Sequence, residues 1–202
     1  MRFAVIDTEG GGLNPLEHSL LTVGVVIIDL PMGDVVAEAE FKVLETPLIV
    51  QREALEVNRI NLKEHRAEAD TPVVVAKRLT TFLKEHITGP IRIAGHNVGY
   101  DVEMLRRLWR QAGYMAPLWP FHYATLDTAS VGYMTTMVFP AKPWDSPSLD
   151  TMLLHYNVPI EEKNRHTALG DAQATAELLA RMLIELRYPD ENEAYKGTFI
   201  AD

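Results

Sequence analysis

The sequence predicts an α/β fold in which a mixed five-stranded sheet, with an antiparallel opening meander, is flanked by helices. Two observations lead to this prediction. Strand-like segments come first, at residues 3–7, 20–30 and 35–44, separated by a glycine loop at 10–12 and a turn at 31–34. Strand and helix patterns then alternate along the rest of the chain, which is typical of a mixed sheet covered by helices.

The later elements are predicted from capping signals and periodicity. Thr71 and Pro72 suit the N-cap and first position of a helix that runs to about residue 86. The elements after it are a strand at 91–94, a helix at about 98–112, a strand near 123–126, a helix capped by Asp127 or Thr128, a short helix opened by Ser146 and Pro147, and a long helix from just after His166 to about residue 186.

Length and composition indicate one globular domain. The 202 residues are 47% hydrophobic, which is enough for a substantial core. We assign residues 1–187 to this domain and 188–202 to a C-terminal tail without a clear pattern.

The chain has no cysteine. The strand pattern begins at Phe3, and the longest apolar run, residues 23–28, is too short to span a bilayer. We therefore expect a cytoplasmic protein with no signal peptide and no membrane partner.

The net charge restricts the kinds of nucleic-acid contact that are open to the chain. A formal charge of −9 argues against a protein that neutralises many phosphates of long duplex DNA. An acidic chain can still hold one or two phosphates through bound divalent cations, which supply the positive charge that the composition lacks.

Two carboxylates end the first predicted strand. Asp7 and Glu9 are two positions apart, so both side chains point to the same face of the strand. Burying both is costly, because each carboxylate loses hydration and repels the other. A strand that simply ends in solvent is the ordinary explanation for such a pair. A bound cation is the alternative.

Two further acids lie on apolar helix faces. Asp101 is in the middle of the hydrophobic stripe of the helix at 98–112, where capping of the helix N-terminus is one explanation. Asp171 falls inside the apolar stripe of the last long helix. A basic side chain could pair with these acids, but no Lys or Arg recurs on the two apolar faces. A divalent cation bound by several carboxylates accounts for all four positions together.

His166 comes five residues before Asp171, in a polar stretch. A lone histidine in a loop is usually a surface residue. Beside a cluster of carboxylates and metal it is suited to act as a general base, because imidazole can be neutral near pH 7 and can accept a proton from water.

These residues together resemble the DEDDh exonucleases, which include the proofreading subunit of bacterial replicative polymerase, RNase T and oligoribonuclease. The resemblance rests on Asp7 and Glu9 in IDTEGGGL, Asp101 in GHNVGYD, and His166 with Asp171 in RHTALGDA. It implies a ribonuclease-H-like fold and 3′-to-5′ hydrolysis that releases nucleoside 5′-monophosphates. It also implies two Mg²⁺ or Mn²⁺ ions. One would be held by Asp7, Glu9 and Asp171, and the other by Asp7 and Asp101, with His166 as the base.

The resemblance also suggests substrate contacts. The resemblance places the backbone of Gly10 and Gly11 against the terminal nucleotide. Family members often carry Thr or Met side chains at these positions. It places Leu13 against a base. Arg165 is a candidate for phosphate contact, with a solvated polar turn as the alternative. Asn97 and Tyr100, beside Asp101, are candidates for lining the site, with ordinary packing as the alternative.

The sequence thus predicts a metal-dependent 3′-to-5′ exonuclease that acts on single-stranded ends, with DNA preferred to RNA. The preference rests on the three glycines after Glu9, where oligoribonuclease-like chains tend to carry Met-Thr-Gly. A polymerase or another replication or repair protein is a candidate partner. The alternatives are an RNA or oligoribonucleotide exonuclease and a non-catalytic binding module with the same fold.

Overall fold

The computed structural model describes residues 1–113, 119–138 and 146–188. Its five-stranded sheet has the order β3-β2-β1-β4-β5. The strands are β1 (Arg2–Gly10), β2 (Leu20–Asp29), β3 (Asp34–Lys42), β4 (Ile93–Gly95) and β5 (Leu126–Asp127). β1, β2 and β3 pair antiparallel, whereas β4 runs parallel to β1 and β5 parallel to β4. The predicted mixed sheet with an opening meander is therefore confirmed.

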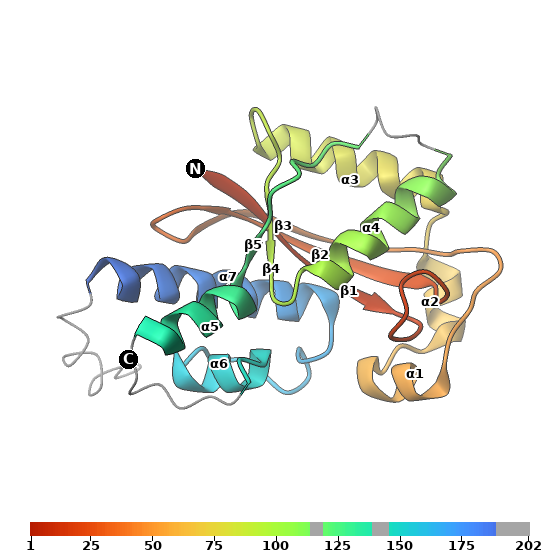
Figure 1. Cartoon of the computed structure of the whole chain (residues 1–202). Coiled ribbons are helices and arrows are strands. Elements are labelled where there is room, and N and C mark those ends of the chain that lie inside the picture. The colour runs from red at the N-terminus through yellow and green to blue at the C-terminus, as the bar shows by residue number, and fades with distance from the viewer. Residues whose placement is uncertain (114–118, 139–145, 189–202) are drawn as a thin grey trace.

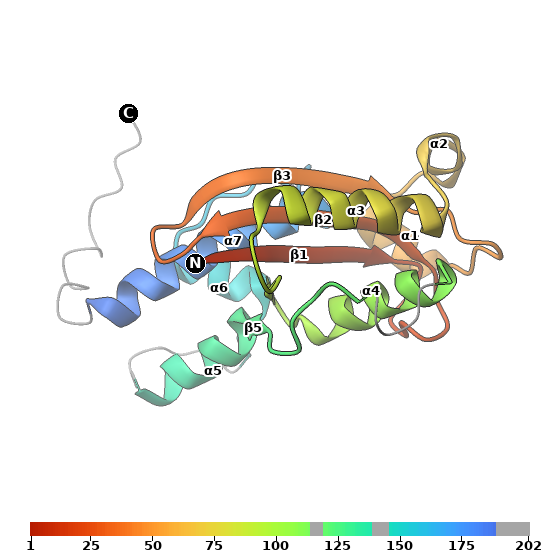
Figure 2. The ribbon, with the colours of Figure 1, turned by 90° about the horizontal axis from the view of Figure 1, so that it is seen from above.

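Helices cover both faces of this sheet (Figure 1). Those in the described residues are α1 (Arg52–Asn58), α2 (Leu62–Glu68), α3 (Pro72–His86), α4 (Gly99–Gln111), α5 (Thr128–Val138), α6 (Leu149–His155) and α7 (Ala168–Arg187). α3 and α4 lie on one face and α7 on the other, with α6 beyond α7 (Figure 1). Seen from above, α3 lies over β2 and β3 and runs roughly along them (Figure 2).

Alternating strand residues form two hydrophobic cores. Ala4 and Ile6 of β1 pack with α3 and α4, whereas Val5 packs with Ala172 and Ala176 of α7. This alternation is the period of two that a strand imposes on its side chains. Because Asp7 and Glu9 continue the series of Val5, they lie on the face of the sheet that α7 covers.

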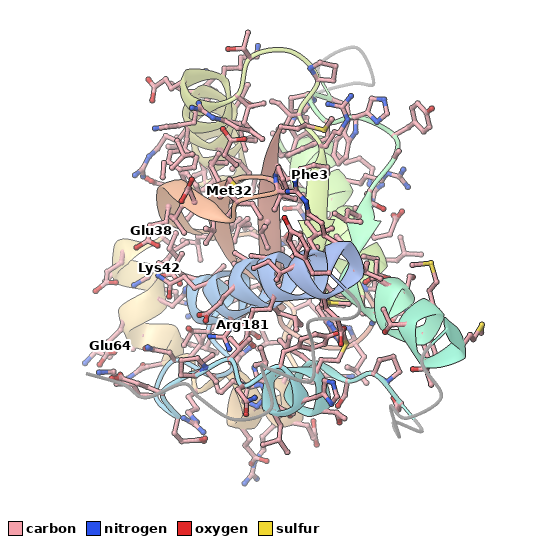
Figure 3. All side chains as sticks on the ribbon, turned by 90° about the vertical axis from the view of Figure 1, so that its left-hand side faces the viewer. Phe3, Met32, Glu38, Lys42, Glu64 and Arg181 are labelled. Carbon is pink, nitrogen blue, oxygen red and sulfur yellow. The ribbon has the colours of Figure 1, made fainter. Side chains whose placement is uncertain are left out.

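A third core joins α6 to α7. Met152 and Leu153 of α6 pack with Leu178 and Met182 of α7. Arg181 of α7 reaches toward α6 (Figure 3) and donates to the carbonyl oxygens of Tyr156 at 2.7 Å and Asn157 at 2.9 Å. These contacts hold α6 and the residues after it against the second half of α7.

Several predicted boundaries require correction. α1 and α2 were not predicted, because each has only seven residues and is too short to show a clear apolar period. β5 covers only Leu126 and Asp127, not residues 123–126, since its two residues are defined by pairing with β4 and not by composition. α6 begins at Leu149, after the N-cap Ser148, and not at Ser146. The predicted tail from 188 lies outside the described residues, except for Tyr188.

Among the described residues, no helix combines the length and hydropathy that crossing a membrane requires.

Candidate metal and active site

The ends of two parallel strands bring the acidic residues together. β1 and β4 run in the same direction, so their carboxyl ends lie at the same edge of the sheet. Asp7 and Glu9 come from the end of β1, and α4, which carries Asp101, begins four residues after β4 ends. This edge is a common location for ligand sites in sheets with parallel strands.

Gly24 lets α7 reach the same place. It pairs with Asp7 across β1 and β2, and a Cβ atom there would lie 2.2 Å from the backbone carbonyl of Ala168. The first turn of α7 therefore packs directly on β2. The Thr167 side chain caps the helix by accepting from Gly170 N at 3.1 Å, and Asp171 lies in the first turn.

Asp7, Glu9 and Asp171 form the centre of the site. Each offers a carboxylate oxygen, and these three oxygens lie within 4.8 Å of one another. Burial, together with the charges of Asp101, Glu9 and Asp171, raises the pKa of Asp7 well above its usual value. Burial and the charges of Asp171 and Asp101 raise the pKa of Glu9 to about 8. The carboxylates thus repel one another, as expected of groups that share a cation.

Asp101 lies beside this group, held by Thr8. The residue is buried, and its Oδ1 accepts a hydrogen bond from the Thr8 hydroxyl at 2.7 Å. Burial raises the pKa of Asp101 to about 7, although the bonds from Thr8 oppose the shift. The N-cap of α4 is Val98, so the capping explanation for Asp101 is wrong. Asp101 is outside the set of three close oxygens, but its charge still acts on Asp7 and Glu9.

Arg165 is the basic partner that the helix patterns did not reveal. Such a residue was expected on the apolar helix faces, whereas Arg165 comes from the loop before α7. It is 9% exposed and donates to Asp171 Oδ1 through Nη1. Its Nε and Nη2 donate to Asp150 Oδ1 at 3.0 and 2.6 Å. The solvated-turn alternative for Arg165 is therefore wrong.

His166 occupies the turn directly before α7. Its φ of 59° is in the left-handed region, which is uncommon for a residue other than glycine and costs about 1–3 kcal/mol. The backbone N–H of His166 donates to Asp171 Oδ2 at 3.2 Å. The half-buried imidazole thus belongs to a segment that is bonded to the carboxylate group.

The glycine loop is built into the fold. A Cβ atom at Gly10 would lie 2.2 Å from the Tyr100 hydroxyl, and one at Gly11 would lie 2.4 Å from the carbonyl oxygen of Ile49. Gly11 N donates to Ser19 O at 2.7 Å, and Gly11 O accepts from Gln51 N at 2.6 Å. Close packing therefore explains these glycines, and their contact with a nucleotide stays a prediction.

The other predicted substrate contacts differ in exposure. Leu13 is 93% exposed. Asn97 is exposed and donates its backbone N–H to Asp127 Oδ1 at 2.8 Å. Tyr100 is partly buried and donates its hydroxyl to Gly12 O at 2.8 Å. Burial and the nearby acids raise the pKa of Tyr100, so the phenol stays protonated and keeps this bond.

Three polar residues of the site were not predicted from the sequence. Thr8 binds Asp101, and Asp150 binds Arg165. Asn58 is buried at the end of α1 and donates to Gly10 O at 3.2 Å. It also forms a hydrogen bond with the Glu9 side chain. This bond lowers the pKa of Glu9, against the larger effect of burial. Thr8 could have been found because it lies between the two acids. Asn58 and Asp150 belong to short helices without such a local signal.

Comparison with known proteins agrees with this geometry. A family model described as exonuclease, of the RNase T type, matches residues 4–179. The chain belongs to this exonuclease family. The resemblance to DEDDh exonucleases is thus confirmed. A DNA polymerase III subunit epsilon-like protein of Rhodobacter capsulatus is 31% identical over 188 residues, which cover 93% of this chain and 24% of that protein.

Solved exonuclease structures share the ribonuclease-H-like fold. E. coli exonuclease I in complex with a dT13 oligonucleotide superposes with a TM-score of 0.76 at 21% identity, covering 96% of this chain and 43% of that one. Exonuclease I from Methylocaldum szegediense superposes with a TM-score of 0.76 at 16% identity, covering 96% and 44%. The chain therefore spans less than half the length of these exonuclease relatives.

The donor set of the site suits a hard divalent cation. It consists of carboxylate oxygens only, which Mg²⁺ and Mn²⁺ prefer to the nitrogen and sulfur ligands typical of zinc. The mutual repulsion that raises the pKa values of Asp7 and Glu9 would be relieved by such an ion. Asp7, Glu9 and Asp171 would hold it.

Proposed function

We propose that the chain is a metal-dependent 3′-to-5′ exonuclease that acts on single-stranded DNA ends and releases nucleoside 5′-monophosphates. The main support is the convergence of Asp7, Glu9 and Asp171 at one edge of an exonuclease-family fold. Exonuclease I of E. coli, which has the same fold, has been solved with the oligonucleotides dT13 and dA16. These complexes favour DNA as the substrate class.

Two Mg²⁺ or Mn²⁺ ions would supply charge stabilisation for the attacking and leaving oxygens at phosphorus. Asp7, Glu9 and Asp171 would hold one ion, and Asp7 and Asp101 the second. The Thr8 hydroxyl would orient Asp101 and favour its ionised form. The imidazole of His166 would take the proton of the attacking water. The bond from the His166 backbone N–H to Asp171 holds this residue beside the carboxylates.

Leu13 would provide the apolar contact to a base. A leucine that is 93% exposed has little other role in the fold, and its apolar surface can cover the face of an unstacked base. The epsilon-like relative suggests that a polymerase or a repair protein is a partner of this chain. The base contact of Leu13 and the polymerase or repair partner are both predictions made from the sequence.

The direct test is digestion of single-stranded DNA and RNA oligomers of identical sequence, labelled at the 5′ end, with Mg²⁺, Mn²⁺ or EDTA. We expect DNA to be shortened stepwise from the 3′ end and RNA to be shortened more slowly. Neither should be shortened in EDTA. A strong preference for RNA would favour the oligoribonucleotide alternative. Binding of DNA without hydrolysis under every condition would favour a non-catalytic module.

Two variants connect this activity to the site. His166→Ala should lower turnover by about 10²- to 10⁴-fold, the usual contribution of a general base, and retain Mn²⁺ binding. Asp7→Asn should lose both Mn²⁺ binding and turnover. Glu85→Gln, which changes an exposed carboxylate of α3 on the far face, is the matched control and should change neither.

A further inference from the structure

A cation of the protein itself already lies among the carboxylates. The guanidinium of Arg165 lowers the pKa values of both Asp7 and Glu9, against the larger effect of their burial. The Arg165 side chain is 10% exposed, and that of its partner Asp171 is 8% exposed. Arg165 therefore supplies positive charge to the site without any metal.

Arg165 uses an oxygen that a metal would also need. Asp171 Oδ1 accepts from Arg165, and Oδ2 accepts from the backbone N–H of His166. A divalent ion near Asp171 would also be repelled by the guanidinium. Binding of the ion and retention of the Arg165–Asp171 pair therefore oppose each other.

Asp150 offers the guanidinium a second partner. It lies in the first turn of α6, and its side chain is 73% exposed, so it is outside the buried group. Two nitrogen atoms of Arg165, Nε and Nη2, already donate to Asp150 Oδ1, whereas only Nη1 reaches Asp171. The guanidinium can thus give up Asp171 and keep its bonds to Asp150.

We propose that Arg165 is an internal counter-ion that competes with the divalent cation for Asp171, and that Asp150 is a positioning residue that retains Arg165 when the ion binds. The inference rests on the proposed function, because it concerns the metal of that site. It means that Arg165 stabilises the metal-free state and sets the metal concentration at which the site fills.

A calorimetric titration of Mn²⁺ into the protein, without nucleic acid, tests this inference. Arg165→Gln should bind Mn²⁺ more tightly, by about fivefold or more, which is the lower range of coupling between two sites. Asp150→Asn should bind Mn²⁺ more weakly, because the Arg165 guanidinium then has Asp171 as its only carboxylate partner. Arg59→Gln, which removes an exposed arginine paired with Glu162, should bind like the wild type.

The double variant Arg165→Gln/Asp150→Asn separates this mechanism from general electrostatics. If Asp150 acts through Arg165, the Asp150→Asn change has no effect once Arg165 is absent, and the double variant binds Mn²⁺ like Arg165→Gln. If Asp150 acts only through its charge, it weakens binding equally in both backgrounds. That second result would overturn the proposal.

Thermal unfolding provides a second measurement, which in EDTA does not depend on metal affinity. In EDTA, Arg165→Gln should unfold at a lower temperature than the wild type, because the buried carboxylates lose their counter-ion. Mn²⁺ should then raise its melting temperature by more than it raises that of the wild type. An equal rise in the two proteins would contradict the inference and leave the proposed function standing. Failure of the wild type to bind Mn²⁺ at all would overturn both.

Discussion

The Thr8 hydroxyl donates a 2.7 Å hydrogen bond to Oδ1 of Asp101, and both residues are buried. The bond joins the end of β1 to the first turn of α4. It favours the ionised form of Asp101 in a place where burial raises the pKa of this residue to about 7. Thr8, between the two acids of β1, therefore contributes to the site from the opposite face of the strand.

Replacement of Thr8 by valine removes this donor with little change of volume. We expect the pKa of Asp101 to rise further, so that activity reaches its maximum at higher pH than in the wild type. Stability should fall by about 1–3 kcal/mol, since a buried acceptor loses its partner. The pH–rate profile measures the first effect. Thr80→Val, on α3, also removes a hydroxyl hydrogen bond but should leave the profile unchanged.

The raised pKa of Glu9 predicts how the metal-free protein responds to pH. The folded carboxyl titrates near 8, and the unfolded one near 4.5. Between these values the folded state binds the proton more tightly, so the free energy of unfolding should fall as pH rises from about 4.5 to about 8.

Unfolding in EDTA across this pH range measures the effect. Glu9→Gln should be less sensitive to pH than the wild type, because it lacks the titrating group. Glu85→Gln should retain the wild-type dependence. A Glu9→Gln protein with the same pH dependence as the wild type would show that Glu9 is not responsible.

Gly24→Ala should displace the start of α7. The added Cβ would lie 2.2 Å from the carbonyl of Ala168 and 2.4 Å from Leu169 N, and both are backbone atoms that cannot move separately from the helix. We expect a loss of about 1–3 kcal/mol in stability, the usual cost of overpacking, together with weaker Mn²⁺ binding through Asp171.

Gly99→Ala is the control for the change from glycine to alanine. A Cβ at Gly99 meets nothing within 4 Å, and alanine favours the helix in which this residue lies. Its stability should be equal to that of the wild type or slightly higher. Similar stability losses in both variants would contradict the role of Gly24 in the approach of α7.

Leu13→Ala should affect substrate binding without affecting the fold. Because the side chain is 93% exposed, its removal should leave the melting temperature unchanged. KM for single-stranded DNA should rise severalfold if a base packs on Leu13, because the buried apolar contact is then lost. Met32→Ala, at another exposed apolar residue, should leave KM unchanged. An unchanged KM in Leu13→Ala would exclude the base contact.

Much of the fold followed from local patterns. The opening meander was visible because its strands of nine or ten residues are rich in apolar residues and are separated by glycine and proline turns. The positions of Asp101 and Asp171 followed from helix periodicity, and both are buried as that periodicity implies. The short helices α1 and α2 were not found, because seven residues complete only two turns.

The sequence by itself determined which residues could do chemistry here, since a period of two or 3.6 places each carboxylate on a face of its own element. Only the tertiary structure decided their partners. That Asp101 accepts from Thr8, and that Arg165 joins Asp171 to Asp150, depends on how β1, α4, α6 and α7 pack together. Residues from separate elements meet through packing, such as the close approach at Gly24, and no local period encodes that distance.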